Sequence, residues 1–549
     1  MNYNIAETLP IIAESHPDRI GLICRTRAHW RSWTFKELDH TADSFAYTLK
    51  SMGVNRGDRT MLMVRPSVEF ITLTFALFKI GAIIVLIDPG MGYKNLLKCI
   101  TSVRPEVFIG IPRAHLFRHV FPRHFKTVRT SVCIGPSLGL FGQSFSAETA
   151  QRSQMYGTSF QAASMQPDDS AAILFTTGST GPPKGVRYEH ATFQAQLHLI
   201  RDYYAIGPDD IDQPAFPLFA LFSTGLGVCS VIPEMNPAKP ARVNAEKFVH
   251  TIKKYKVTYS FGSPAIWNVV SRYCLEHEIT LPTVRKILMA GAPVPGELLQ
   301  RTLAVLSPDA EIHTPYGATE SLPVASITAK EILAETWDKT RKGHGVCVGR
   351  MLPGIEIRII KITDEPVKKW VDSLQLSAQE IGEIIVRGAV VTRAYDNNDT
   401  ENRLTKIKDN KGFWHRMGDL GYFDDDSRLW FCGRKGQRVV TESSTLFTVC
   451  CEAIFNEHPE VFRSALVGVG PKGGQEPVLI VEMHEKRINR QTLFAELRQL
   501  ALQNDMTRSI EHFLVHPGFP VDIRHNAKIF REKLSLWATD RLKKELQTA

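Results

Sequence analysis

The segment from Ala171 to His190 constrains the fold of this chain more than any other part of its sequence. An apolar run typical of a buried β-strand, Ala171–Thr176, leads into a loop of threonine, serine, glycine, proline and lysine. Apolar residues then recur at helical spacing from about Ala191. A buried strand, a glycine-rich loop and a helix in this order are typical of an α/β protein with parallel strands.

The loop has the chemistry of a polyphosphate-binding site. Its residues are Thr176, Thr177, Gly178, Ser179, Thr180, Gly181, Pro182, Pro183 and Lys184. Glycines let backbone N–H groups approach phosphates closely, while hydroxyls add donors and the lysine adds charge, so the loop suits ATP. The spacing is not that of the common P-loop, and Thr177 replaces the first glycine of a nucleophile elbow. The alternative is a polar surface loop, but so long a string after a buried strand argues against it.

Helical patterns alternate with short β-rich runs for several hundred residues. This alternation predicts an α/β fold, with a large N-terminal domain of parallel or mixed sheets flanked by helices. Near Gly433 the pattern changes to a small α+β unit, with strands at Ser464–Val469 and Pro477–Met483 and a final helix at Lys533–Leu546. The predicted units are a large domain, 1–432, a hinge, 433–437, and a small mobile lid domain, 438–549.

Composition and charge leave several partners open. Hydrophobic residues make up 43% of the 549 residues, and the net charge is +9, which suits anionic substrates, an acidic membrane surface or nucleic acid. Ordinary solvated cations are the simpler interpretation, and no nucleic-acid partner is expected. The apolar stretch Ile71–Ile87 is divided by Lys79, so we expect a buried helix running into a strand and no transmembrane segment. The nine cysteines form no CxxC pair and no signal peptide is seen, which predicts a cytoplasmic protein.

Residues 176–185, TTGSTGPPKG, resemble the signature loop of the adenylate-forming superfamily, which includes acyl-CoA synthetases, nonribosomal adenylation domains and luciferases. Further motifs appear in that family's order along nearly the whole chain. They are Ala290-Gly291-Ala292-Pro293, Tyr316-Gly317-Ala318-Thr319-Glu320, Met417-Gly418-Asp419, Gly433-Arg434 and the C-terminal stretch 520–534 with Lys528.

The resemblance implies a role for each motif around ATP. It implies that Gly291, Ala292 and Pro293 wall the adenine pocket, Tyr316 and Gly317 lie near adenine, Thr319 contacts the α-phosphate, Glu320 coordinates Mg²⁺, Asp419 holds the ribose, Arg434 reaches the nucleotide, and Lys528 is catalytic. The physical logic is that attack of a carboxylate on a phosphate brings anions together, so positive charge must be placed in advance. Taken singly, each residue has an ordinary structural interpretation, but their joint occurrence in this order favours an adenylate-forming enzyme.

Three departures set this sequence apart from typical coenzyme A ligases. Ala220 stands where a histidine is expected, Gly436 lies where relatives carry aspartate or lysine, and the stretch 439–455 lacks a lysine-x-x-glycine pattern. With these departures the chain resembles a narrower group, the bacterial olefin β-lactone synthetases. That resemblance implies a long-chain 2-alkyl-3-hydroxy acid as substrate, whose own hydroxyl attacks the adenylate and closes a β-lactone. It also implies partners from the olefin pathway: a thiolase-like enzyme, a reductase and an α/β-hydrolase-like enzyme.

Two other functions stay open at this point. One is a fatty-acyl-CoA synthetase or acyl-AMP ligase, which a reaction without coenzyme A would separate from a lactone-forming enzyme. The other is a non-catalytic nucleotide sensor, which would need neither the magnesium ligand nor the lid lysine. The sequence leaves chain length, stereochemistry, the use of coenzyme A, the base for the β-hydroxyl, the oligomeric state and any membrane-surface or multi-enzyme association undetermined. Phe216, Phe219, Phe222, Leu226 and Trp267 are candidates for an acyl pocket or for ordinary core.

Overall fold

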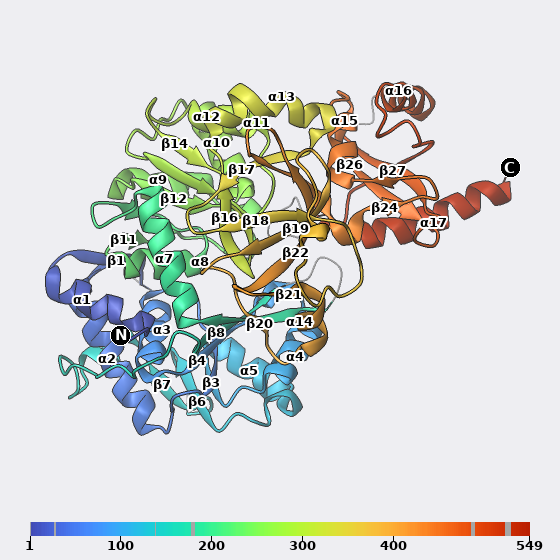
Figure 1. Cartoon of the computed structure of the whole chain (residues 1–549). Coiled ribbons are helices and arrows are strands. Elements are labelled where there is room, and N and C mark those ends of the chain that lie inside the picture. The colour runs from blue at the N-terminus through green and yellow to red at the C-terminus, as the bar shows by residue number, and fades with distance from the viewer. Residues whose placement is uncertain are drawn as a thin grey trace.

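The computed structural model describes residues 2–26, 29–137, 139–176, 182–484, 489–521 and 529–548. Three large sheets with flanking helices make up the chain as far as Arg434, and a separate three-stranded sheet lies in the C-terminal part (Figure 1). The protein therefore has the predicted fold class, a large α/β unit of mixed sheets and a small α+β unit.

The first sheet carries the strand that leads into the glycine-rich loop. Its order is β20-β9-β8-β4-β3-β5-β6-β7, and the strands from β3 to β8 run parallel. The strands are β3 (Arg59–Met63), β4 (Ile83–Leu86), β5 (Val107–Gly110), β6 (Thr130–Ile134), β7 (Gln143–Phe145), β8 (Ser170–Thr176), β9 (Lys184–Glu189) and β20 (Ala394–Tyr395). The sequence missed β9, which returns antiparallel to β8 before helix α7 (His190–Tyr204) begins. Lys184 therefore starts a strand, opposite Thr176, rather than ending a loop.

Helix α3 (Val68–Ile80) and strand β4 account for the apolar stretch that the sequence assigned to a buried helix and strand. Its single charge, Lys79, is 2% exposed and its ammonium contacts the carboxylates of Asp39, at 2.6 Å, and Asp43 on helix α2 (Phe35–Ser51). Burial raises the pKa of Asp43 to about 6. The chain turns out of α3 at Gly81, whose φ of 79° favours glycine.

The second sheet has the order β14-β13-β12-β10-β11-β1-β2, parallel except for the pair β1 and β2. Its strands are β1 (Ile20–Arg25), β2 (Trp30–Thr34), β10 (Ile211–Asp212), β11 (Cys229–Val231), β12 (Tyr259–Gly262), β13 (Lys286–Met289) and β14 (Glu311–His313). Short apolar strands buried on both faces by helices are typical of such parallel sheets.

The third sheet is antiparallel, where the alternation in the sequence had favoured parallel strands. Its order is β15-β16-β17-β23-β22-β19-β18, with β21 beside β22. The strands are β15 (Tyr316–Ala318), β16 (Ser321–Ser326), β17 (Val346–Met351), β18 (Glu356–Ile360), β19 (Gly382–Arg387), β21 (Lys406–Asp409), β22 (Gly412–Phe423) and β23 (Leu429–Arg434). β22 and β23 form a hairpin that turns at residues 424–428.

The C-terminal part contains the sheet β26-β27-β28 and its flanking helices. The strands and the final helix of this part lie close to their predicted positions. Its elements are β24 (Val439–Val440), β25 (Thr445–Leu446), α15 (Thr448–Phe455), β26 (Val461–Val469), β27 (Glu476–Met483), α16 (Arg490–Leu502), β28 (His512–Val515) and α17 (Arg531–Thr548). The chain leaves the third sheet at Arg434 and passes through the short helix η8 (Lys435–Gln437). The domain boundary and the hinge at 433–437 remain predictions.

The remaining helices cover the sheets and link the strands. They are α1 (Thr8–Ser15), α4 (Tyr93–Val103), α5 (Pro112–Val120), α6 (Ala147–Gln151), α8 (Pro217–Gly225), α9 (Ala245–Tyr255), α10 (Pro264–Glu276), α11 (Gly296–Leu303), α12 (Ala329–Glu331), α13 (Trp337–Lys339) and α14 (Asp399–Thr405). Within the described ranges, no helix combines the length and the apolar character that crossing a bilayer requires. All nine cysteines are buried free thiols.

Candidate active site

A cleft of about 1840 Å³ brings together most of the predicted site residues. The predicted residues that line it are Thr176, Lys184, Gly291, Tyr316, Gly317, Thr319, Glu320 and Arg434. Ala292, Pro293 and Asp419 do not line it, although their neighbours Ala290, Gly291 and Gly418 do. Thr177, Gly178, Ser179, Thr180, Gly181 and Lys528 lie outside the described residues.

Tyr316, Asp419 and Arg434 form one connected group at the polar end of the cleft. The Tyr316 hydroxyl donates to Asp419 Oδ2 at 2.7 Å, and Arg434 Nη1 lies 2.7 Å from Asp419 Oδ1. Asp419 and Arg434 face each other because they are paired across the antiparallel strands β22 and β23. Burial raises the pKa of Asp419, and the charge of Arg434 opposes that rise. Tyr316 and Arg434, which line the cleft, thus fix this buried carboxylate beside it. Each carboxylate oxygen has the capacity for a second hydrogen bond, such as one from a sugar diol.

Thr319 and Glu320 lie in a backbone turn that is held on several sides. The Glu320 carbonyl accepts bonds from the Thr392 N–H at 2.9 Å and the Thr392 hydroxyl at 3.0 Å. The Thr319 carbonyl accepts a bond from the Tyr188 hydroxyl. Gly317 is required in this hairpin, because a Cβ there would lie 2.6 Å from the Ser321 carbonyl oxygen. The turn therefore presents Glu320 to the cleft from a rigid backbone.

The Glu320 carboxylate suits a magnesium ion that is held mainly by substrate phosphates. Its Oε1 accepts a bond from the Tyr395 hydroxyl at 2.7 Å, and the residue lines the cleft. In the described ranges, no group of three or more His, Cys, Asp or Glu side chains could hold a metal by itself. Magnesium is commonly bound by one or two carboxylates plus phosphate oxygens, so this donor set fits it.

Lys184 places a positive charge near Tyr395, the residue that binds Glu320. Its ammonium lies 2.6 Å from Glu401 Oε2 and 5.5 Å from the centre of the Tyr395 ring. Burial and the Glu320 carboxylate raise the pKa of Tyr395 above its usual range, so its hydroxyl remains a donor. A phosphate entering the cleft would compete with Glu401 for the Lys184 ammonium.

Sequence reasoning missed Tyr188, Tyr395 and Glu401. Tyr395 reaches Glu320 because the two-residue strand β20 pairs with β9, which brings it from 75 residues away. No local pattern marks any of the three residues, so only the pairing of distant segments could have identified them.

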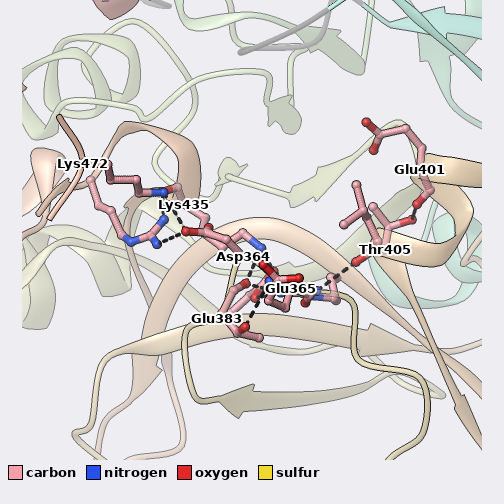
Figure 2. Close-up of polar contacts among 11 residues, drawn as sticks. Asp364, Glu365, Glu383, Glu401, Thr405, Lys435 and Lys472 are labelled. Atoms are coloured by element: carbon pink, nitrogen blue, oxygen red, sulfur yellow. Dashed lines mark hydrogen bonds and ion pairs between the residues drawn. The ribbon is translucent and has the colours of Figure 1, made fainter.

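Polar contacts join the segment after β23 to the third sheet (Figure 2). Lys435 Nζ lies 2.9 Å from Glu383 Oε1, and Glu383 is also bound by Arg416 at 2.6 Å. Asp364 accepts from Arg438 at 2.8 Å and from Lys472 at 2.7 Å, and these cations hold the pKa of Asp364 below its usual range. The C-terminal unit is thus held against the large unit at the edge of the cleft.

The other end of the cleft is apolar. It is lined by side chains from α3, α7 and α8, including Phe75, Phe78, Leu197, Ile200, Phe219 and Phe222. Of the acyl-pocket candidates, Phe216, Phe219 and Phe222 line the cleft, whereas Leu226 and Trp267 do not. Trp267 is completely buried in the core of the second sheet. A ligand with a polar head and an apolar tail fits such a cleft.

The model of the AMP-binding enzyme family matches residues 11–396. The chain belongs to this family and is an adenylate-forming enzyme. At closer range it is similar to two bacterial proteins named olefin beta-lactone synthetase. The one from Stenotrophomonas maltophilia is 43% identical over 98% of this chain and 99% of its own length. The one from Xanthomonas campestris pv. campestris is 43% identical over 97% of each.

Solved structures show the same fold at lower sequence identity. The anthranilate CoA ligase AuaEII in complex with anthranoyl-AMP superposes with a TM-score of 0.79 at 20% identity, covering 99% of this chain and 98% of that one. ATP-bound MatB from Rhodopseudomonas palustris gives 0.78 at 20% identity, covering 98% and 99%.

Proposed function

We propose that the enzyme activates a carboxylic acid with ATP and Mg²⁺. A carboxylate oxygen attacks the α-phosphorus, the bond between the α- and β-phosphates breaks, and pyrophosphate leaves the acyl-adenylate behind. Asp419 and Tyr316 position the nucleoside, Lys184 offsets the negative charge of the phosphates, and the loop 176–181 donates hydrogen bonds to them. Magnesium held at Glu320 would add positive charge to the phosphate oxygens.

The second step that we propose is closure of a β-lactone. The β-hydroxyl oxygen of the substrate attacks the acyl carbon, its proton is released, and the acyl–phosphate bond breaks to free AMP. The support is the similarity to the two β-lactone synthetases over nearly the full chain. A tethered hydroxyl needs no path for a thiol, which agrees with the departures from coenzyme A ligases at Ala220, Gly436 and 439–455.

The substrate that we propose is a long-chain 2-alkyl-3-hydroxy acid. The observation that carries this proposal is that one cleft joins the carboxylate-and-cation end at Glu320 and Lys184 to an apolar end lined by α3, α7 and α8. Enzymes of an olefin pathway would supply this acid and consume the lactone.

We also propose that residues 438–549 act as a lid hinged at 433–437, with Lys528 as its catalytic lysine. A lid that completes the site only after the acid and ATP have bound would shield a hydrolysable adenylate from water. The polar contacts at Asp364 and Lys435 would then be among those exchanged as the lid moves.

The test is to supply purified enzyme with ATP, Mg²⁺ and a racemic long-chain 2-alkyl-3-hydroxy acid, without coenzyme A, and to identify products by mass spectrometry. We expect the acid minus one water, as a β-lactone, with AMP and pyrophosphate. A stalled adenylate that gives a thioester only when coenzyme A is added would instead identify an acyl-CoA ligase. Coenzyme A ligases are found among relatives at 24–25% identity. Absence of pyrophosphate exchange with every acid tried would favour the nucleotide sensor.

A further inference from the structure

We propose that a basic and apolar face beside the cleft docks on an anionic phospholipid bilayer. The docking face consists of α4 (Tyr93–Val103), α5 (Pro112–Val120), the 3-10 turn η3 (Pro122–Phe125) with its C-cap residue Lys126, and the loop 139–142. The proposal rests on the proposed function in one respect, because the long-chain acid proposed as substrate would partition into bilayers. The evidence for the face itself is charge, exposure and its place at the cleft.

The docking face holds a concentration of positive charge. Between residues 89 and 130 the sequence has eight lysines and arginines and one acidic residue, Glu106, while the whole chain has a net charge of +9. In the sequence these cations are spread out and look like ordinary solvated residues. The fold brings cations of α4 and η3 together, because the ring of Tyr93 on α4 stacks on Phe121, and Thr101 on α4 hydrogen-bonds His124 in η3 at 2.7 Å. Arg129 lies outside this face and pairs with Asp58. Figure 1 shows α4 and α5 together at the lower edge of the large unit.

These cations are largely without internal partners. No carboxylate in the described part of the chain forms an ion pair with Lys94, Lys98, Arg113, Arg123 or Lys126. The one acid of the stretch, Glu106, is occupied by the backbone N–H of Arg59 at 2.7 Å. Unpaired cations on one face create a positive potential that attracts anions.

Exposed apolar side chains lie among the cations. Leu116 and Val120 on α5 are 57% and 61% exposed, and Tyr93 on α4 is 57% exposed. Arg113, Leu116 and Val120 follow one another at i, i+3 and i+7, so they share the outward face of α5. The loop with Leu140, which is 69% exposed, packs on α5 because Phe141 stacks on His115. Aliphatic and aromatic side chains mixed with cations suit the headgroup region of an acidic bilayer, whereas nucleic acid offers no partner for the aliphatic ones.

The docking face adjoins the cleft. Arg113, Ala114 and Phe117 of α5 and Leu96 of α4 line the same cleft as Glu320 and Phe75, and Arg113 is exposed to solvent. The cleft therefore opens beside α5. An acid dissolved in a bilayer under this face would reach the cleft without its alkyl chains crossing water, whose contact with apolar surface is unfavourable.

The experiment is vesicle flotation of the full chain with two lipid mixtures, phosphatidylcholine alone and phosphatidylcholine with phosphatidylglycerol, at low and high salt. The test variant is the triple substitution Lys94→Gln, Lys98→Gln, Lys126→Gln, none of which lines the cleft. The matched control is Lys247→Gln, Lys253→Gln, Lys254→Gln on α9, which changes net charge equally on a different helix. A second variant, Leu116→Ser with Val120→Ser, removes the apolar contribution at exposed sites that should not affect folding.

We expect the wild type and the α9 control to float with the phosphatidylglycerol vesicles, and less so at high salt. The test variant should bind them about 100-fold more weakly, since each cation near an acidic surface contributes roughly a fivefold factor. The Leu116 and Val120 variant should bind about tenfold more weakly. Equal binding by the test and control variants, equal binding to both lipid mixtures, or capture of an acidic protein without any vesicle binding would overturn the proposal. Pyrophosphate release with a soluble β-hydroxy acid, measured without vesicles, tests the proposed function separately and should be the same in all of these variants.

Discussion

The two ends of the cleft are built in different ways. At the polar end, single contacts join residues that are far apart in the chain, such as the Tyr316 hydroxyl and Asp419, 103 residues apart. At the apolar end, many side chains of similar character from α3, α7 and α8 share one surface. When one partner of a buried hydrogen bond is removed, no neighbouring group takes its place, and the other partner is left unsatisfied. The free energy of apolar burial depends on the buried area, so one apolar side chain can be exchanged for another at small cost. Substitutions at the polar end should therefore lower activity with every acid, and those at the apolar end should change which acid is used.

The largest effect is expected for Lys528→Ala. Removing an ammonium that meets charge developing in the transition state should slow adenylation by about 10³-fold, while ATP binding changes little. Pyrophosphate exchange and nucleotide titration measure the two quantities. Lys533→Ala, in the exposed first turn of α17, is the matched control and should exchange at the wild-type rate. Adenylation at the wild-type rate by Lys528→Ala would show that the lysine has no such role.

The next largest effect is expected for Glu320→Gln. The amide keeps a hydrogen-bond acceptor for Tyr395 but loses the charge that a magnesium ion needs, so activity should fall by about 100-fold. The half-saturating magnesium concentration should rise in a titration at fixed ATP. Glu297→Gln, an exposed residue of α11, should leave the titration unchanged. An unaltered magnesium dependence in Glu320→Gln would exclude this residue as the ligand.

Asp419→Asn and Tyr316→Phe should separate charge from hydrogen bonding in the nucleoside corner. Asp419→Asn leaves Arg434 without its ion pair and weakens the acceptor for a sugar diol, so KM for ATP should rise about 10–100-fold. Tyr316→Phe removes one donor only, and a rise of roughly fivefold is expected. Initial-rate kinetics over a range of ATP concentrations measure both. The reverse order of effects would contradict the role given to the carboxylate.

Phe222→Ala should change acid preference rather than abolish activity. It enlarges the apolar end of the cleft, and differences of a few methylenes are worth about 10-fold in the ratio of kcat/KM for two chain lengths. Competition between a shorter and a longer β-hydroxy acid reports that ratio directly. Leu275→Ala, which is 47% exposed on α10 and does not line the cleft, is the control. Loss of activity with acids of every chain length would contradict the expectation that the apolar end of the cleft sets acid preference.

The smallest effect, on stability alone, is expected for Lys406, which binds the residue that holds the Glu320 turn. Burial lowers the pKa of Lys406, which donates to the Thr392 carbonyl, from 10.5 to about 7. The ammonium of Lys406 keeps its proton up to a higher pH in the unfolded chain than in the folded chain. Burying the charged ammonium therefore lowers the free energy of unfolding by its full amount below pH 7, and this loss disappears as pH rises toward 10.5. Lys406→Met should therefore raise the free energy of unfolding relative to wild type more at pH 6 than at pH 9.5. Urea unfolding at both values measures this, with Lys408→Met, exposed on the same strand, as a control that should show no such pH dependence.

Much of the fold could be predicted because its signals are local. The apolar runs at 171–176 and 464–469, and the final helix predicted at Lys533–Leu546, follow from patterns within a few residues. Strand β9 was missed because its sequence, KGVRYE, follows a loop pattern and gains its partner only by turning back on β8. The third sheet is antiparallel because short hairpins join β15 to β16, β21 to β22 and β22 to β23, and because β19, which is distant in the chain, pairs with β22.

The sequence by itself determined which chemical groups are present and in what order, because the motif residues from Thr176 to Lys528 are read from short strings. Only the tertiary structure decided which of them meet. It brought Tyr395 to Glu320, set Glu401 against Lys184, joined polar and apolar residues in one cleft, and packed α4 against the turn η3. The physical reason is that periodicity and turn chemistry act over a few residues, whereas a contact between side chains depends on the packing of segments far apart in the chain.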